Sequence, residues 1–164
     1  DKGAYFTRGT SRDPQAKYSE RGADYTYNMQ RLQRKFETAK ALLPQPVELR
    51  AADPTRHGAI FFGSTTPAML EAIERLRMAG IEIDALRVRG YPFADSVRAF
   101  IDSHESVFVV EQNRDAQLRT LLVDQFGTNP ARLPSVLHYD GTPITATFIA
   151  NAIVGVAEAA KEAP

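Results

Sequence analysis

Five side chains that can donate or accept hydrogen bonds follow one another directly after an apolar run at residues 107–110. They are Glu111, Gln112, Asn113, Arg114 and Asp115. Two of them suit the start of a following helix, because Asn113 can accept hydrogen bonds from backbone N–H groups and Asp115 favours the positive end of a helix. The other three offer donors and acceptors to a ligand or to another protein. We therefore expect this segment to be a recognition surface.

Other chemistry has weaker support in the pattern of residues. Ser64, His138 and Asp140 supply the residue types of a hydrolase triad, but Ser64 lacks the Gly-x-Ser-x-Gly context of a nucleophile elbow. The three histidines of the chain are not spaced as metal ligands. The turn at residues 63–67 could bind an anion, yet the chain has neither a phosphate-binding P-loop nor Gly-x-Gly-x-x-Gly spacing. A capped turn without a ligand is the better interpretation.

A polar loop at residues 7–13 is the second candidate for recognition. Arg8 and Arg12, together with three hydroxyl side chains and Asp13, make it dense in hydrogen-bonding groups. Two guanidinium groups can hold a carboxylate or a phosphate. The alternative is an ordinary solvent-exposed loop, and composition alone favours that alternative.

Composition excludes several classes of protein. The chain of 164 residues has 43% hydrophobic residues, which is enough for a packed core, and it has no Cys, which excludes disulfides and cysteine-ligated clusters within it. The net charge is zero, which argues against binding of nucleic acid. Residues 1–50 nevertheless carry ten basic and six acidic side chains. This imbalance indicates either a solvated surface or a basic arm that lies on an acidic neighbour. No membrane span or signal peptide is visible, and we expect a cytoplasmic protein.

The polar segment must be positioned by a parallel sheet. Residues 107–110 are apolar without alternation, which predicts a strand buried on both faces, and a helix that ends near Gly127 follows. Further strands are predicted at residues 59–62, 81–88 and 134–138, with helices between them. The strand at 81–88 alternates and should be less buried. Such alternation of strands and helices predicts an α/β fold with a mostly parallel sheet.

Before this sheet we expect a long helix at residues 22–43. Its apolar side chains recur every three or four residues, which gives a narrow stripe that can dock on one surface. The stripe consists of Tyr25, Met29, Leu32, Phe36, Ala39 and Leu43. Prolines then end the helix, and residues 47–50 can form a short edge strand. His104 lies on an apolar helical face, so we expect a packed core residue.

The segment from Val107 to Leu118, with His138-Tyr139-Asp140-Gly141-Thr142-Pro143-Ile144-Thr145 downstream, resembles the carboxyl-terminal part of the α subunit of 2-oxoacid:ferredoxin oxidoreductases. The resemblance is strongest to the 2-oxoglutarate type and spans nearly the whole chain. It implies a three-layer α/β/α sandwich like the transketolase carboxyl-terminal domain. That sandwich has five strands, of which the first is antiparallel at an edge, and the strands at 59–62 and 107–110 would be central neighbours.

The resemblance also implies a division of the chain. Residues 1–20 would be the tail of a preceding pyrimidine-type domain. Residues 21–56 would be a connecting helix and a Pro-rich linker, and residues 57–164 the transketolase-like domain. The chain would then be part of a longer subunit.

The same resemblance implies an enzyme complex that oxidatively decarboxylates a 2-oxoacid, forms an acyl-CoA and reduces ferredoxin. The complete complex would contain thiamine diphosphate, Mg, a [4Fe-4S] cluster and CoA. The ligands of thiamine diphosphate and of the cluster would sit largely in the β subunit, and this chain would bind no cofactor and be inactive alone. Its partners would be the β subunit, a second α subunit and, through the complex, ferredoxin.

No catalytic residue of the family can be transferred to this chain. Candidate assembly residues are Arg8, Arg12, Asp13, Glu111, Gln112, Asn113, Arg114, Asp115, His138 and Asp140. The alternative is a stand-alone flavodoxin-like ligand-binding or regulatory module.

Overall fold

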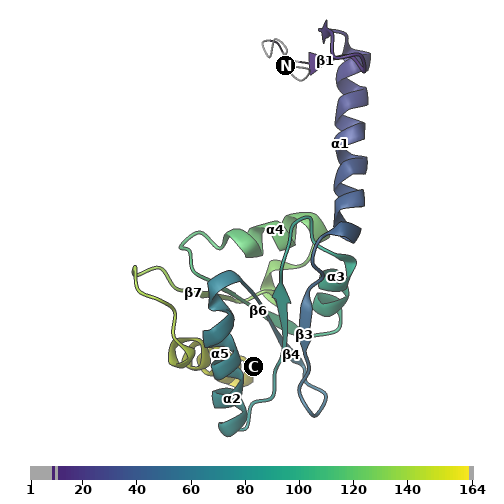
Figure 1. Ribbon diagram of the computed structural model, residues 1–164. Helices are drawn as coiled ribbons and strands as arrows, with labels where there is room; N and C mark the ends of the chain where they lie inside the picture. Colours follow the sequence, from purple (N-terminus) through teal and green to yellow (C-terminus); the bar gives the residue numbers. More distant parts are fainter. Residues whose placement is uncertain (1–8, 10, 163–164) are drawn as a thin grey trace. The chain divides into compact units, whose positions relative to one another are not determined.

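The computed structural model describes Gly9 and residues 11–162, the side chains of residues 157–162 excepted. The chain forms two compact units, Asp1–Leu42 and Leu43–Pro164 (Figure 1). The predicted boundaries at residues 20 and 56 rest on the resemblance and stay a prediction.

The first unit is a small hairpin followed by a long helix. Strands β1 (Ser11–Arg12) and β2 (Tyr18–Ser19) pair antiparallel, and helix α1 (Gly22–Leu42) confirms the predicted helix. The side-chain amide of Asn28, on α1, donates to Ser11 Oγ and to the backbone carbonyl of Arg12, both at 2.8 Å. These bonds tie the hairpin to the helix. None of the α1 side chains is buried.

The second unit is built on a five-stranded sheet in the order β3-β5-β4-β6-β7. Its strands are β3 (Val47–Leu49), β4 (His57–Phe62), β5 (Asp84–Val88), β6 (Ser106–Glu111) and β7 (Ser135–Leu137). The edge strand β3 is antiparallel to β5, and the other pairs are parallel. The predicted fold class is confirmed, including the antiparallel first strand and the central pairing of β4 with β6.

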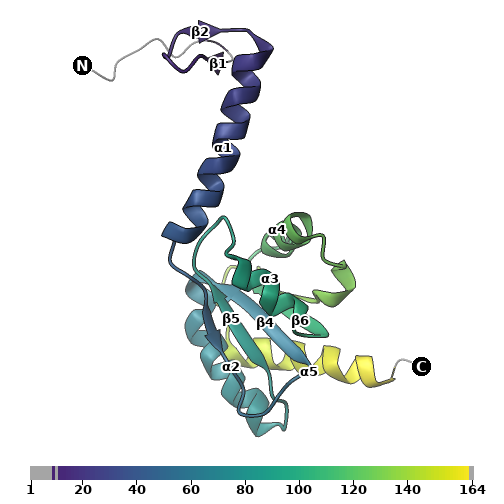
Figure 2. The same ribbon diagram turned by 90° about the vertical axis from the view of Figure 1, so that its right-hand side faces the viewer.

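Helices cover both faces of this sheet, as Figure 2 shows. Helices α2 (Thr66–Met78) and α5 (Ala146–Glu162) pack on one face, and α3 (Asp95–Asp102) and α4 (Gln117–Phe126) pack on the other. Two buried hydrophobic clusters therefore lie above and below the strands. This is the three-layer α/β/α sandwich that the sequence predicts.

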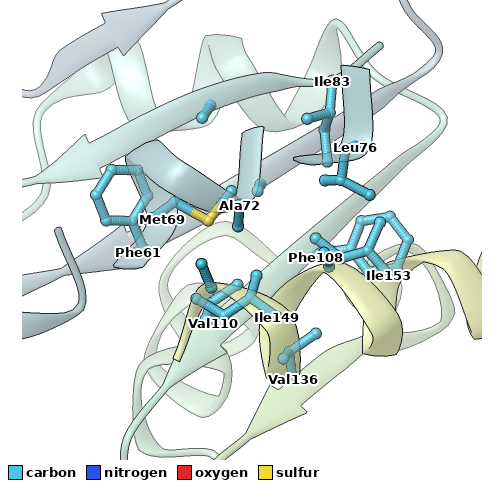
Figure 3. Close-up of a cluster of buried hydrophobic side chains, with 14 of the residues drawn as sticks. Phe61, Met69, Ala72, Leu76, Ile83, Phe108, Val110, Val136, Ile149 and Ile153 are labelled. Carbon is cyan, nitrogen blue, oxygen red and sulfur yellow. The ribbon is translucent and has the colours of Figure 1, made fainter. Parts of the chain in front are cut away.

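Strand β6 contributes to both clusters, because successive side chains of a strand point to opposite faces. Phe108 packs in the cluster with α2 and α5, where Figure 3 shows its ring beside Ile153. Val107 and Val109 belong to the cluster with α3 and α4. All four apolar residues of the run are buried. The prediction of a strand buried on both faces is thus confirmed.

The prediction of a less buried strand at residues 81–88 was wrong. Strand β5 begins only at Asp84, and it is an interior strand that lies between β3 and β4. Of the two polar residues in the alternation, Glu82 lies before the strand, and Asp84 is only 5% exposed. Alternation of apolar and polar residues predicts exposure of the polar ones, whereas Asp84 is buried among partners.

Those partners come from three different segments. The Asp84 carboxylate accepts hydrogen bonds from Arg50 Nη1 at 2.7 Å and from the backbone N–H of Ala51 at 2.7 Å. His104 Nε2 lies 3.1 Å from the same carboxylate, and His104 Nδ1 lies 2.7 Å from the backbone carbonyl of Phe100. His104 is therefore the packed core residue that the sequence predicts. Burial alone raises the pKa of Asp84, but these three donors outweigh burial, and the pKa lies below its ordinary value.

This depressed pKa predicts a pH-dependent stability. The Asp84 carboxylate stabilises the fold at pH values above the unfolded pKa, which is about 4, and that stabilisation is lost as the pH falls through the lower, folded pKa. We expect Asp84→Asn to reduce the free energy of unfolding at pH 7 by about 1.5–3 kcal/mol. Urea denaturation from pH 7 down to pH 3 should show the difference from wild type shrinking. Asp53→Asn, at an exposed position, is the control. A difference that is independent of pH would contradict this explanation.

Candidate functional site

The candidate site is the segment Glu111–Asp115, at the carboxyl end of β6. In an open α/β sheet, this edge is where ligands and partners bind. Its neighbours are the turn after β4 and the loop after β7, since β6 lies beside β4 and pairs with β7 on its other side. The site is therefore a meeting point of three loops.

Glu111 is a structural residue of this segment. Its side chain is fully buried, and its carboxylate accepts the backbone N–H groups of Leu118 at 2.8 Å and Arg119 at 3.2 Å. It also accepts a hydrogen bond from Asn113 Nδ2 at 2.7 Å. A carboxylate at the amino end of a helix satisfies N–H groups that have no partner within the helix. Glu111 thus caps α4 from the end of β6, a role that the sequence did not predict.

Asn113 holds the shape of the loop. Its Oδ1 accepts the backbone N–H groups of Asp115 at 3.1 Å and of Gln117, the first residue of α4, at 3.2 Å. This confirms the predicted capping by Asn113. Ala116, between them, has a positive φ of 50°, an uncommon conformation for a residue with a Cβ atom. The bonds to Glu111 and Asn113 hold the chain in that conformation.

Gln112 links the three loops of the edge. Its Nε2 lies 3.1 Å from Ser64 Oγ and 3.2 Å from Thr65 Oγ1, after β4, and its Oε1 accepts the backbone N–H of Ile144 at 3.4 Å. A small cavity of about 370 Å³ lies beside it. The cavity is lined by Ser64, Gln112, Gly141, Thr142, Pro143 and Ile144. The polar groups of the Gln112 side chain therefore form hydrogen bonds within this chain.

Arg114 and Asp115 are exposed to solvent, as is Gln112, but unlike Gln112 they make no hydrogen bond to another loop among the described residues. The side chain of Arg114 is 75% exposed, and its Nε donates to Asp115 Oδ1 at 2.7 Å. An exposed pair of this kind contributes little to stability. The guanidinium therefore remains available for a partner.

His138 and Asp140 lie after β7, in the third loop. His138 is buried and packs edge-on against Phe148, with ring centroids 5.0 Å apart. Its Nε2 is 3.4 Å from Asp140 Oδ1. Asp140 is exposed, and the hydrogen bonds from the backbone N–H and the hydroxyl of Thr142 lower the pKa of its carboxyl group. Ser64 is paired with Gln112 and not with His138, so these side chains do not form a nucleophile–base pair.

The remaining predicted residues belong to the first unit. Asp13 Oδ1 accepts the backbone N–H groups of Gln15 and Lys17, both at 2.9 Å, and closes the hairpin turn. Arg12 Nη1 donates to the backbone carbonyl of Ala16 at 3.2 Å. Arg8 lies outside the described residues. Since the structure describes the two units separately, it does not bring these residues to the edge of the sheet.

An apolar groove of about 550 Å³ adjoins the polar segment. It runs along the carboxyl ends of β4 and β5 and the side of α4, and Asn113 forms part of its lining. Three of its large side chains, Phe62, Tyr91 and Leu121, are exposed. The sequence did not predict this groove, because its residues come from four segments that only the fold brings together. Together, groove and polar segment form a surface with an apolar centre and polar neighbours, which is the usual anatomy of a protein interface.

Removal of the buried charge of Glu111 should test its capping role. Glu111→Gln keeps the shape of the side chain but replaces one acceptor oxygen by an NH₂ group, which cannot accept from the N–H groups of α4. We expect the free energy of unfolding to fall by about 1–3 kcal/mol, the cost of an unsatisfied buried group. Urea denaturation measures it, with the exposed Asp115→Asn as control. Equal, small effects of the two changes would contradict the capping role.

No metal centre is evident in the part of the chain that the structure describes. Within Gly9 and residues 11–162, no group of three or more His, Cys, Asp or Glu side chains is placed to hold an ion. Within the same residues, no helix is long and apolar enough to cross a membrane.

The fold defines a transketolase-like α/β domain, and the candidate site lies at the carboxyl edge of its sheet. A split-gene transketolase, solved as an inactive β4 tetramer, superposes with a TM-score of 0.55 over 68% of this chain and 40% of its own, at 16% identity. The 2-oxoglutarate:ferredoxin oxidoreductase from Magnetococcus marinus superposes better, with a TM-score of 0.79 over 93% of this chain and 26% of its own, at 18% identity. At these identities the two structures show the fold.

Sequence similarity identifies the relatives of the chain. It is 30% identical over 134 residues to subunit alpha of 2-oxoacid:ferredoxin oxidoreductase 2 from Aeropyrum pernix, a match that covers 79% of this chain and 21% of that protein. No family model matches the chain. The chain is a homologue of part of a 2-oxoacid:ferredoxin oxidoreductase α subunit, which confirms the predicted resemblance. It spans about a fifth of the length of that relative.

Proposed function

We propose that the chain is the carboxyl-terminal domain of the α subunit of a 2-oxoacid:ferredoxin oxidoreductase, with 2-oxoglutarate as the substrate of the complete enzyme. The complex would decarboxylate the 2-oxoacid oxidatively, transfer the acyl group to CoA and reduce ferredoxin. The observation that carries this proposal is the similarity over 134 residues to a protein named as an α subunit. The superposition on a 2-oxoglutarate:ferredoxin oxidoreductase is consistent with it.

Within that enzyme, the domain would serve assembly and not catalysis. The chain has no Cys to ligate an iron–sulfur cluster, and its described acidic and histidine side chains form no cluster that fits a Mg ion. Mg and the [4Fe-4S] cluster would therefore be held by other parts of the complex, where the resemblance also places thiamine diphosphate, and we propose the same for CoA. The polar segment Glu111–Asp115 and the adjoining apolar groove would contact those parts.

The proposed partners are the β subunit and a second α subunit, with ferredoxin as the electron acceptor of the complex. The Aeropyrum relative is named as a subunit, which supports an assembly of several polypeptides. A cytoplasmic location follows from this proposal. A stand-alone flavodoxin-like module is not favoured, because the relatives are oxidoreductase subunits.

The test is 2-oxoacid-dependent reduction of a viologen dye in the presence of thiamine diphosphate, Mg²⁺ and CoA. We expect no turnover from the 164-residue chain alone. We expect turnover when the protein is purified from its own cells with its associated polypeptides, and faster turnover with 2-oxoglutarate than with pyruvate. Activity of the isolated chain would contradict the assembly role. If the purified assembly reduces the dye neither with 2-oxoglutarate nor with pyruvate, the proposed enzyme activity is contradicted.

A further inference from the structure

The apolar groove beside the polar segment lies where the order of the strands reverses. From β4 the chain passes to β5 on one side, and it then crosses to β6 on the other side. In open α/β sheets, ligands bind at such a point, in the crevice outside the carboxyl ends of the strands. Phe62 and Gly63, at the end of β4, and Asn113 and Gln117, after β6, are among the residues that line the groove. The groove therefore occupies the usual position of a ligand site in this class of fold.

The groove also has the size and the lining of a small-molecule site. Its volume of about 550 Å³ lies within the range of ligand pockets, about 300–1,000 Å³, and such pockets are mostly apolar with few polar groups. Tyr91, Phe93 and Leu121 belong to the lining, and the two aromatic rings meet edge to face with centroids 5.2 Å apart. Every lining residue belongs to the second unit, Leu43–Pro164. The site is therefore built within one unit of the chain and suits a ligand with an apolar body.

The charged residues of the groove have one sign. Arg87 and Arg89 belong to the lining, and no Asp or Glu is among the described residues that line it. Arg87 Nε is buried and has no hydrogen-bond partner within the described part of the chain. A guanidinium keeps its positive charge in proteins, and a buried donor without an acceptor costs free energy that an acceptor recovers. An anionic group in the groove would supply that acceptor and balance the charge.

We infer that the groove binds a small amphipathic carboxylate, with an apolar body on the aromatic lining and the carboxylate paired with Arg87. A carboxylate matches the planar guanidinium through charge-assisted hydrogen bonds. Arg89 adds a second positive charge at the same groove. This inference goes beyond the proposed function and does not depend on it, because residues of this chain alone would recognise the ligand.

The experiment titrates two probes of the same shape into the complete 164-residue chain by isothermal titration calorimetry. One probe is naphthalene-2-carboxylate, and the other is its neutral amide. We expect the carboxylate to bind about tenfold more tightly than the amide, because a hydrogen bond to a charged group is stronger than one between neutral groups. Equal affinities, or binding of neither probe, would overturn the inference. Binding of an acidic, apolar peptide without binding of the carboxylate would assign the groove to a protein partner and would also overturn it.

Arg87→Gln tests the proposed anchor. The change removes the positive charge and the Nε donor, so the preference for the carboxylate over the amide should be lost. The affinity for the amide should stay the same, because the apolar lining is unaltered. Circular dichroism verifies that the variant is folded. A preference that persists in the folded variant would overturn the role of Arg87.

A matched pair of exposed leucines locates the site without a change to the core. Leu121, in the lining on α4, is 44% exposed, and Leu70, on α2 and outside the lining, is 47% exposed. Leu121→Glu places a carboxylate in the groove, and repulsion between like charges should weaken binding of the naphthalene carboxylate about tenfold. Leu70→Glu makes the same change elsewhere and should leave binding unaltered. Equal effects of the two variants would overturn the assignment of the ligand to this groove.

Discussion

Replacement of Phe108 by alanine is expected to reduce the free energy of unfolding by about 3–5 kcal/mol. The ring is 1% exposed and lies in the cluster that joins β6 to α2 and α5. A truncation there removes the transfer free energy of the ring and leaves a cavity that close-packed neighbours fill only in part. Since a domain of this size has a total stability of about 5–15 kcal/mol, the loss would be a large share of it. Urea denaturation followed by far-UV circular dichroism measures it directly.

The control for this change is Phe62→Ala, at the end of the neighbouring strand β4. Phe62 is 41% exposed, so its truncation removes less buried area and leaves no closed cavity. We expect a loss of about 1 kcal/mol for it. A loss well below 1 kcal/mol for Phe108→Ala, or equal losses for both variants, would mean that β6 is not the centre of the core.

The position of that centre could be predicted from the sequence because four apolar residues in succession require burial on both faces. The order of the neighbouring strands could not be derived in this way. It followed from the resemblance, which implied an antiparallel edge strand and the pairing of β4 with β6. Asp84 shows why the local pattern of apolar and polar residues did not predict the burial of β5. A buried carboxylate and an exposed one look the same in a sequence, and Arg50 and His104, which make burial possible, lie 34 and 20 residues away.

The candidate site was predicted as a segment, whereas the structure divides its members by role. Asn113 was expected to cap the helix and does so. Glu111 was counted among the residues available for a partner, yet it is buried and caps α4 across a loop. Gln112 is bound to the turn after β4. The types of residue predicted the location of the polar segment, but only the path of the loop decides which groups face inward.

The same division sharpens the expected role of Arg114. Glu111, Gln112 and Asn113 use their polar groups within the chain, whereas the Arg114 guanidinium is exposed and, among the described residues, is paired only with the exposed Asp115. A planar guanidinium can hold a carboxylate through two parallel hydrogen bonds, which an ammonium group cannot reproduce. Arg114 also directly follows Asn113, which belongs to the polar segment and lines the apolar groove. Arg114 is thus the best single anchor of the proposed interface.

Arg114→Ala is therefore expected to weaken association with the proposed partner, the β subunit, tens- to thousands-fold. This range corresponds to about 2–5 kcal/mol, the cost of removing one partner from a buried charged pair at an interface. The stability of the chain itself should change by less than about 1 kcal/mol, because the pair with Asp115 is exposed. Titration of the β subunit against wild-type and variant α subunit, with a melting curve of each, measures both quantities.

Two further variants separate a specific contact from a general effect of charge. Arg114→Lys keeps the positive charge and loses the planar fork, so it should recover only part of the affinity. Arg75→Ala removes a half-exposed arginine on α2, which is paired with Glu71 at 2.7 Å, and it should leave association unchanged. If Arg114→Ala and Arg75→Ala both leave association and stability unchanged, the segment after β6 is a helix cap with spare polar residues. Recognition of the partner must then lie elsewhere on the domain.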